Sequence, residues 1–176
     1  MSALSAKRIR KLLETLNEEL KKQSVEGEIY LVGGAVMCLV FGARPSTADL
    51  DGYFAPSALL RAAAARVAER EHVDTHWLND GVKGFLSPQG DFSKYLDLDH
   101  LKIMTATPEY LLAMKCLSAR IGEEFHDLED IRFLLRYLNI ESVDQAFEVL
   151  TRYYPLERFP QKSIYILQEF LGSTTP

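Results

Sequence analysis

The chain has 176 residues, of which 47% are hydrophobic and 26% are charged. These proportions are ordinary for globular proteins and exclude a disordered, collagenous or fibrous chain. The length suits one domain that buries its own core without disulfides or structural metal. The 25 acidic and 20 basic residues give a net charge of -5, which argues against a protein that coats nucleic acid by bulk charge.

In chain order we expect a helix over residues 4–22, a strand over 28–32, a Gly33-Gly34 turn, a short helix over 35–41, a strand over 50–54, a helix over 56–71, and a short helix or turn over 77–80. A loop over 87–91 then leads to strands over 95–99 and 101–105 and to helices over 108–121, over 127–138, from Ser142, and over 160–171. This order predicts the α/β (α+β) class, with a mixed sheet flanked by helices. We expect one domain over residues 1–176, with an α/β part to about residue 105 and a helical part from about 106 to 176.

Membrane and export signals are missing from the sequence. The longest apolar run, residues 29–41, has 13 residues including two glycines, whereas a membrane span needs about 20. The basic start of the chain has no apolar signal core after it, so we expect a cytoplasmic protein without a membrane partner. Cys38 and Cys116 lie in apolar stretches without a CxxC motif, which predicts two buried thiols.

The first expected helix is more basic than the rest of the chain. Residues 1–22 hold six basic and three acidic residues, which give the segment a local charge of +3. Either this is a solvated helix face, or it is a contact for nucleic acid.

Two carboxylates, Asp49 and Asp51, flank Leu50 on the second expected strand. Side chains two residues apart on a strand point to the same face, and two close carboxylates repel each other unless a cation lies between them. The pair is therefore either a binding site for a hard cation such as Mg²⁺ or a solvated turn that carries two acids.

The Gly33-Gly34 pair lies between an expected strand and a short helix. Glycine lets a backbone approach a ligand closely, and N–H groups at a helix start can hold an anion. A plain tight turn explains the pair equally well. Together with the acids about fifteen residues later, however, the pair predicts a triphosphate site next to a metal site.

These residues resemble a known superfamily. Gly-Gly on a strand-to-helix turn, followed by Arg-x-x-Thr-x-Asp-Leu-Asp at residues 44–51, resembles the nucleotidyltransferases that include DNA polymerase beta. The closer resemblance is to the branch of minimal, AbiEii-like toxin nucleotidyltransferases and their uncharacterised bacterial relatives. This resemblance covers roughly residues 29–138. Within that range it also includes residues 77–80, Lys115, Arg120, Asp127 and Asp130.

The resemblance implies transfer of a nucleoside monophosphate from an NTP such as ATP to a hydroxyl, with release of pyrophosphate. It implies that Asp49 and Asp51 hold Mg²⁺ or Mn²⁺. It also implies that the triphosphate is contacted by Gly33, Gly34 and one or both of Ser46 and Thr47. The acceptor would be RNA, such as the 3′ end of a tRNA, or a protein, and the chain would be the toxin of a toxin–antitoxin pair with a cognate antitoxin as partner. The alternative is a non-catalytic relative that binds or regulates.

For Lys115, for Arg44 and for a third carboxylate the sequence leaves more than one role open. Lys115 is either a point charge on the outer phosphates or a surface lysine. Arg44 either holds phosphate or braces the strand with the acids, and we favour the brace. Two-metal members of the superfamily use a third carboxylate, and Asp97 is preferred here over Asp99 and Asp80 because Leu96 and Leu98 flank it as core-facing residues would.

Other polar residues give weaker evidence for a functional site. His72 and His76 are four residues apart but have no following ligand motif for zinc. Asp127 and Asp130 suit the N-terminus of a helix, and a packing bond from either to Arg120 is the second interpretation.

Overall fold

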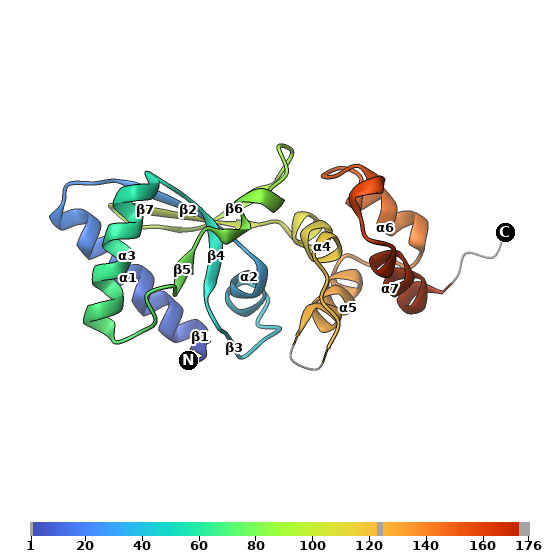
Figure 1. Ribbon diagram of the computed structural model, residues 1–176, viewed down its shortest axis with the longest axis horizontal. Coiled ribbons are helices and arrows are strands. Elements are labelled where there is room, and N and C mark those ends of the chain that lie inside the picture. Colours follow the sequence, from blue (N-terminus) through green and yellow to red (C-terminus); the bar gives the residue numbers. More distant parts are fainter. Residues whose placement is uncertain (1, 123–124, 173–176) are drawn as a thin grey trace. The chain divides into compact units, whose positions relative to one another are not determined.

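The computed structural model describes residues 2–122 and 125–172 (Figure 1). The chain divides into two compact units. The α/β unit comprises Met1–Gly84 and Phe92–Ala106, and the helical unit comprises Phe85–Asp91 and Thr107–Pro176. The α/β class predicted from the sequence is confirmed by a mixed sheet combined with helices.

A five-stranded mixed sheet forms the centre of the α/β unit. Its order is β5-β4-β2-β7-β6. The strands are β2 (Gly27–Val32), β4 (Leu50–Ala55), β5 (Leu78–Asn79), β6 (Phe92–Asp97) and β7 (Leu101–Ala106). Strand β2 runs antiparallel to β4 and parallel to β7, β4 runs parallel to β5, and β6 runs antiparallel to β7.

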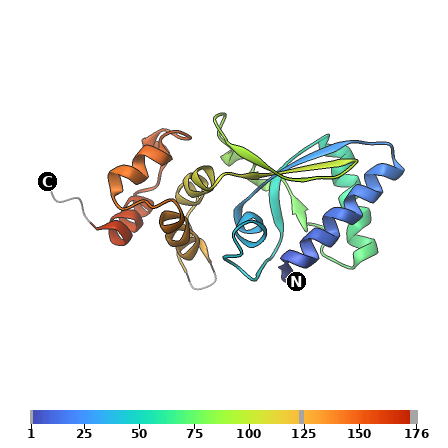
Figure 2. The same cartoon turned by 180° about the vertical axis from the view of Figure 1, so that it is seen from behind.

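Two helices pack together against the sheet, α1 (Ala6–Lys22) and α3 (Ser57–Glu71). Figure 2 shows them side by side. Ser5 caps helix α1, since its hydroxyl accepts the backbone N–H of Arg8, and the helix buries an apolar stripe that includes Leu12 and Leu16. At Gly27 an added Cβ would lie 2.7 Å from Leu60 of α3, so the helix packs closely on the strand.

The pleat of the sheet separates the buried side chains from those of the second face. In β4, Leu50 and Phe54 are buried, whereas Asp51 is half-buried and Tyr53 is exposed. The second face therefore carries Asp51 and Tyr53, followed by Ala55 at the end of the strand.

Two short elements complete the α/β unit. Helix α2 (Gly33–Leu39) follows β2 directly, and a second sheet pairs β1 (Leu4–Ser5) with β3 (Ser46–Thr47). Residues 77–80, expected as a short helix or turn, instead contribute β5, so that prediction was wrong. The reason is that this two-residue strand forms by pairing with β4, whereas its own residues show no alternation that could predict a strand.

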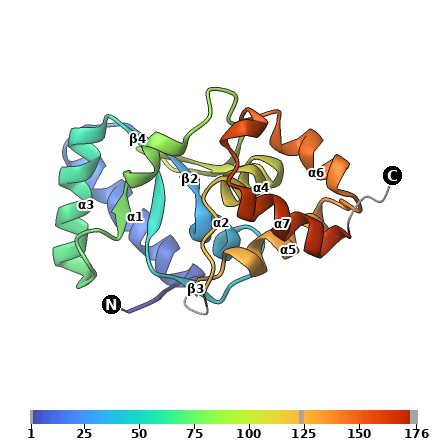
Figure 3. The ribbon, with the colours of Figure 1, turned by 45° about the vertical axis from the view of Figure 1, so that its right-hand side comes forward.

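The described part of the helical unit contains the α-helices α4 to α7, which Figure 3 shows together. They are α4 (Pro108–Leu117), α5 (Asp127–Tyr137), α6 (Val143–Leu150) and α7 (Gln161–Leu171). The hydroxyls of Thr107 and Ser142 cap α4 and α6, as the sequence predicted. None of the helices in the described ranges combines the length and the apolarity that a membrane crossing requires.

The segment Phe85–Asp91 belongs to the helical unit although it lies between β5 and β6 in sequence. The backbone N–H of Ser87 donates to the Tyr110 hydroxyl at 2.8 Å, and the Tyr153 hydroxyl donates to Asp91 at 2.7 Å. The Tyr154 hydroxyl donates to the carbonyl of Phe85. Three tyrosines of the helical unit thus fix this loop.

Candidate functional site

The acid pair and the glycine pair meet at one end of β2 and β4. Asp51 lies opposite Val32 in the register of these strands, and Gly33 follows Val32 as the first residue of α2. Gly33 has a φ of 67°, a conformation that favours glycine. A Cβ added there would lie 3.6 Å from the Asp51 Oδ2 atom, so this carboxylate faces the turn.

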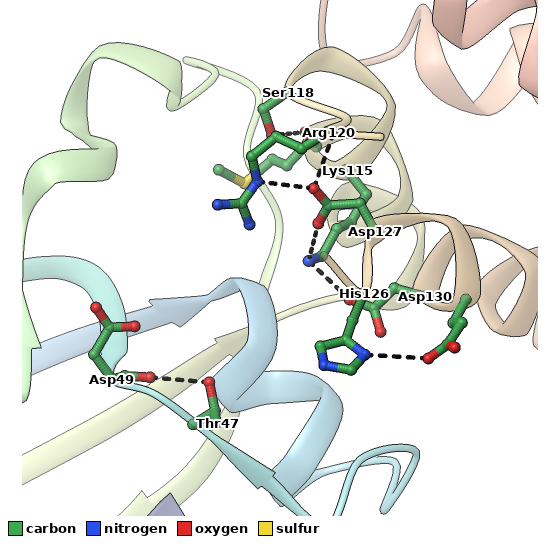
Figure 4. Close-up of polar contacts among 10 residues, drawn as sticks. Thr47, Asp49, Lys115, Ser118, Arg120, His126, Asp127 and Asp130 are labelled. Carbon is green, nitrogen blue, oxygen red and sulfur yellow. Dashed lines mark hydrogen bonds and ion pairs between the residues drawn. The ribbon is translucent and has the colours of Figure 1, made fainter. Parts of the chain in front are cut away.

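Gly34 makes room for two polar side chains. A Cβ at this position would lie 2.7 Å from Nη1 of Arg44 and 2.8 Å from Oγ1 of Thr47. The Thr47 hydroxyl also donates to the backbone carbonyl of Asp49 at 3.2 Å (Figure 4). Gly34, Arg44 and Thr47 therefore form a packed polar group beside the acids.

Asn79 lies beside the acids and was not assigned a role from the sequence. It is the register partner of Asp51 on β5, and its Nδ2 donates to Asp49 Oδ2 at 3.1 Å. Its Oδ1 accepts the backbone N–H of Gly81 at 3.3 Å, which fixes the orientation of the amide. Asn79 therefore bonds one acid and is the strand neighbour of the other.

Ser46 lies on β3, where its register partner is Ser5 of β1. Its side chain is half-buried, whereas that of its neighbour Thr47 is buried at 8% exposure. Of the two hydroxyls considered for phosphate contact, Thr47 is the one that the structure places against Gly34.

The expected third carboxylate, Asp97, does not lie beside the pair. In the strand register, Asp97 pairs with Lys102 of β7, and Lys102 pairs with Glu28 of β2. Asp51 instead pairs with Val32, at the other end of β2. Three strand spacings across the sheet and four residues along it separate Asp97 from Asp51 by about 20 Å. The expectation for Asp97 was wrong. Alternation along a strand predicts on which face of the sheet a side chain lies, but not where in the sheet that strand is placed.

The two other candidates for the third carboxylate are engaged elsewhere. Asp99 accepts hydrogen bonds from Asn17 at 2.7 Å and from Lys21 at 3.1 Å, both on α1. Asp80 follows Asn79, and its Oδ2 lies 2.8 Å from Arg61 and 2.6 Å from Lys83.

The Asp80 pKa is lowered, mainly by the hydrogen bond from Lys83, against the opposing effect of burial. Asp80 therefore stays ionised as the partner of two cations.

The two carboxylates offer oxygen ligands, which suit a hard cation, beside the amide of Asn79. Mg²⁺ is commonly bound through one or two carboxylates, with water and substrate phosphates completing its shell. Asp49 and Asp51 fit this pattern. Within residues 2–122 and 125–172 no group of three or more Asp, Glu, His or Cys side chains that could hold a metal is present. Asp49 and Asp51 are the residues that would hold such an ion.

Lys115 lies in a buried ion cluster of the helical unit (Figure 4). Its Nζ lies 2.9 Å from Asp127 and 2.8 Å from Asp130, and these side chains are only 9%, 4% and 3% exposed. The interpretation as a surface lysine was therefore wrong. The role on the outer phosphates stays a prediction, and the two ion pairs by themselves account for the burial.

Arg120 completes this cluster. Its Nε and its backbone N–H both donate to Asp127 at 3.0 Å, which confirms the predicted packing bond. Burial opposes ionisation of Asp127, but the Lys115 ammonium and the Arg120 donors outweigh burial, so the Asp127 pKa is lowered. The cluster joins the end of α4 to the start of α5.

The predicted buried thiols are confirmed, since Cys38 and Cys116 are both free and buried. Burial raises the pKa of the Cys116 thiol to about 12, which keeps it protonated and unreactive near pH 7.

Comparisons with protein-family models, with curated proteins and with solved structures found no match to this chain.

Proposed function

We propose that the chain is a Mg²⁺-dependent nucleotidyltransferase that moves a nucleoside monophosphate from an NTP to a hydroxyl of RNA or protein. The observation that carries the proposal is the meeting of Asp49, Asp51, Gly33, Gly34 and Thr47 at one end of β2 and β4. Residues up to 18 positions apart in sequence thus form one polar site.

Each part of the site has a role in this reaction. Asp49 and Asp51 would hold Mg²⁺, which neutralises phosphate charge and lowers the pKa of the attacking hydroxyl when bound. The Arg44 guanidinium lies against Gly34 and would brace the site or, as the alternative role, donate to the outer phosphates. The Thr47 hydroxyl beside it holds the backbone of Asp49 in place. Asn79 occupies one oxygen of Asp49 and so orients the carboxylate.

The reaction forms one bond and breaks one bond. The acceptor oxygen attacks the α-phosphorus, the bond from that phosphorus to the bridging oxygen breaks, pyrophosphate leaves, and the hydroxyl proton passes to solvent. We place this reaction in the cytoplasm, in the toxin of a toxin–antitoxin pair, with the tRNA 3′ end as an example of the acceptor.

A second candidate is a non-catalytic protein that binds Mg²⁺-NTP for regulation. The placement of Asp97 at the far end of the sheet favours it, because the two-metal members of the superfamily use a third carboxylate. A transfer assay separates the two candidates.

The assay incubates the chain with each α-labelled NTP, Mg²⁺ and total RNA. We expect label on RNA or on protein, loss of transfer in Asp49→Ala and in Asp51→Ala, and a fall of about 10- to 100-fold in Asn79→Ala. Asp97→Ala is the matched control, since this exposed carboxylate lies on the same sheet and should not matter. Binding of Mg²⁺-NTP without transfer would establish the second candidate, and the absence of binding and transfer would refute both.

A further inference from the structure

A row of aromatic side chains crosses the sheet face that carries Asp51. Tyr53 on β4 lies opposite Tyr30 on β2, with ring centroids 6.0 Å apart. The Tyr30 ring meets Phe92 of β6 edge to face at 5.1 Å. Tyr53 ends the row with 41% of its surface exposed. The row is thus a continuous set of rings with one ring open to solvent.

The position of this row relative to the acids is fixed by the strand. Tyr53 lies two residues beyond Asp51 on β4, so the two side chains share a face and their Cα atoms are about 7 Å apart. The polar group of Gly34, Arg44 and Thr47 lies at the other side of the acids, beyond the start of β4. Polar donors, carboxylates and aromatic rings therefore follow one another along the strand direction.

This order matches the chemical order of an NTP, in which outer phosphates, α-phosphate, ribose and base follow one another. We propose that Tyr53 stacks on the base of the bound NTP and that Tyr30 and Phe92 support it. The inference rests on the proposed function, because the acids must first hold the metal and the phosphates.

The supporting rings make the platform rigid. The Tyr30 hydroxyl donates to Glu28 at 3.0 Å, and its ring lies between those of Tyr53 and Phe92. A rigid aromatic surface stacks on any base, because every base has a π face. The subsite should therefore distinguish an NTP from inorganic triphosphate strongly, and one NTP from another weakly.

The test measures binding of each NTP and of inorganic triphosphate, both with Mg²⁺, to the full chain by calorimetry. Removing one base–aromatic stack in Tyr53→Ala should weaken NTP binding by about 5- to 150-fold and leave triphosphate binding unchanged. Tyr53→Phe should keep NTP affinity, because the ring remains. Tyr165→Ala is the matched control, since Tyr165 is a tyrosine of α7 with 61% exposure.

The outcomes separate this inference from the proposed function. Equal NTP affinity in the wild type and Tyr53→Ala would overturn the inference and leave the proposed function in place. An equal loss of NTP and triphosphate affinity would also overturn it. A wild-type chain that binds neither ligand would overturn both. If Tyr53→Ala fails to fold, Tyr53→Leu replaces it, because leucine keeps apolar contact on the strand but cannot stack.

Discussion

Replacing Lys115 by methionine tests the buried ion cluster most directly. The substitution removes the ammonium and leaves Asp127 and Asp130, only 4% and 3% exposed, next to each other. Removing one partner of a buried ion pair typically costs about 3–5 kcal/mol. Asp127 keeps its bonds from Arg120, but the ammonium that offsets both buried carboxylates is lost. Since a domain is stable by only about 5–15 kcal/mol, Lys115→Met should lose a large part of its stability.

The assay is urea unfolding followed by far-ultraviolet circular dichroism. With a slope of about 2 kcal/mol per molar urea, a loss of about 4 kcal/mol lowers the midpoint by about 2 M. Lys162→Met is the matched control, because Lys162 is an exposed lysine on α7 and its replacement should cost less than about 0.5 kcal/mol.

A second variant keeps the test informative if Lys115→Met does not fold. Adding Asp127→Asn and Asp130→Asn to Lys115→Met removes the buried charges and should recover part of the lost stability. The reasoning fails if Lys115→Met is as stable as Lys162→Met. If such a stable variant also loses nucleotide transfer, Lys115 serves the phosphates instead.

Two further predictions concern the sheet and acid stability. Gly52→Ala would place a Cβ 2.5 Å from the backbone carbonyl of Tyr30, so it should cost about 1–3 kcal/mol in thermal unfolding, whereas Gly84→Ala, with nothing within 4 Å, should be neutral; equal melting temperatures would contradict this. Because the Asp127 pKa is lower in the folded chain, its contribution to stability is complete above about pH 4 and is lost as the pH falls through the folded-state pKa. Urea unfolding at pH 7, 5 and 3 should therefore show a steeper acid loss in the wild type than in Asp127→Asn, and equal slopes would refute the assignment.

Local patterns predicted most elements well, because each has a physical signal in its own residues. The apolar stripe of α1 has helical spacing, and the hydroxyls of Thr107 and Ser142 cap the helices that follow them. The acids and the glycine pair were found because their residue types and spacing imply one site. Their meeting through the register of β2 with β4 agrees with that expectation.

The remaining features depend on partners that are distant in sequence. A two-residue strand such as β5 has no periodicity, so Asn79 could not be placed beside Asp51. Asp97 has the right alternation, but the sheet order puts β6 at the opposite edge from β5. The burial of Lys115 depends on carboxylates 12 and 15 residues later, on another helix, and spacing alone does not reveal such a pair.

The loop Phe85–Asp91 has a consequence for dividing the chain into fragments. The polypeptide leaves the α/β unit after Gly84, returns at Phe92 and leaves again after Ala106. A fragment that ends at Ala106 would retain this loop but lose Tyr110, Tyr153 and Tyr154, to which it is bonded. No single cleavage point therefore yields both units intact, and expression of the α/β unit alone would require a shorter connection between β5 and β6.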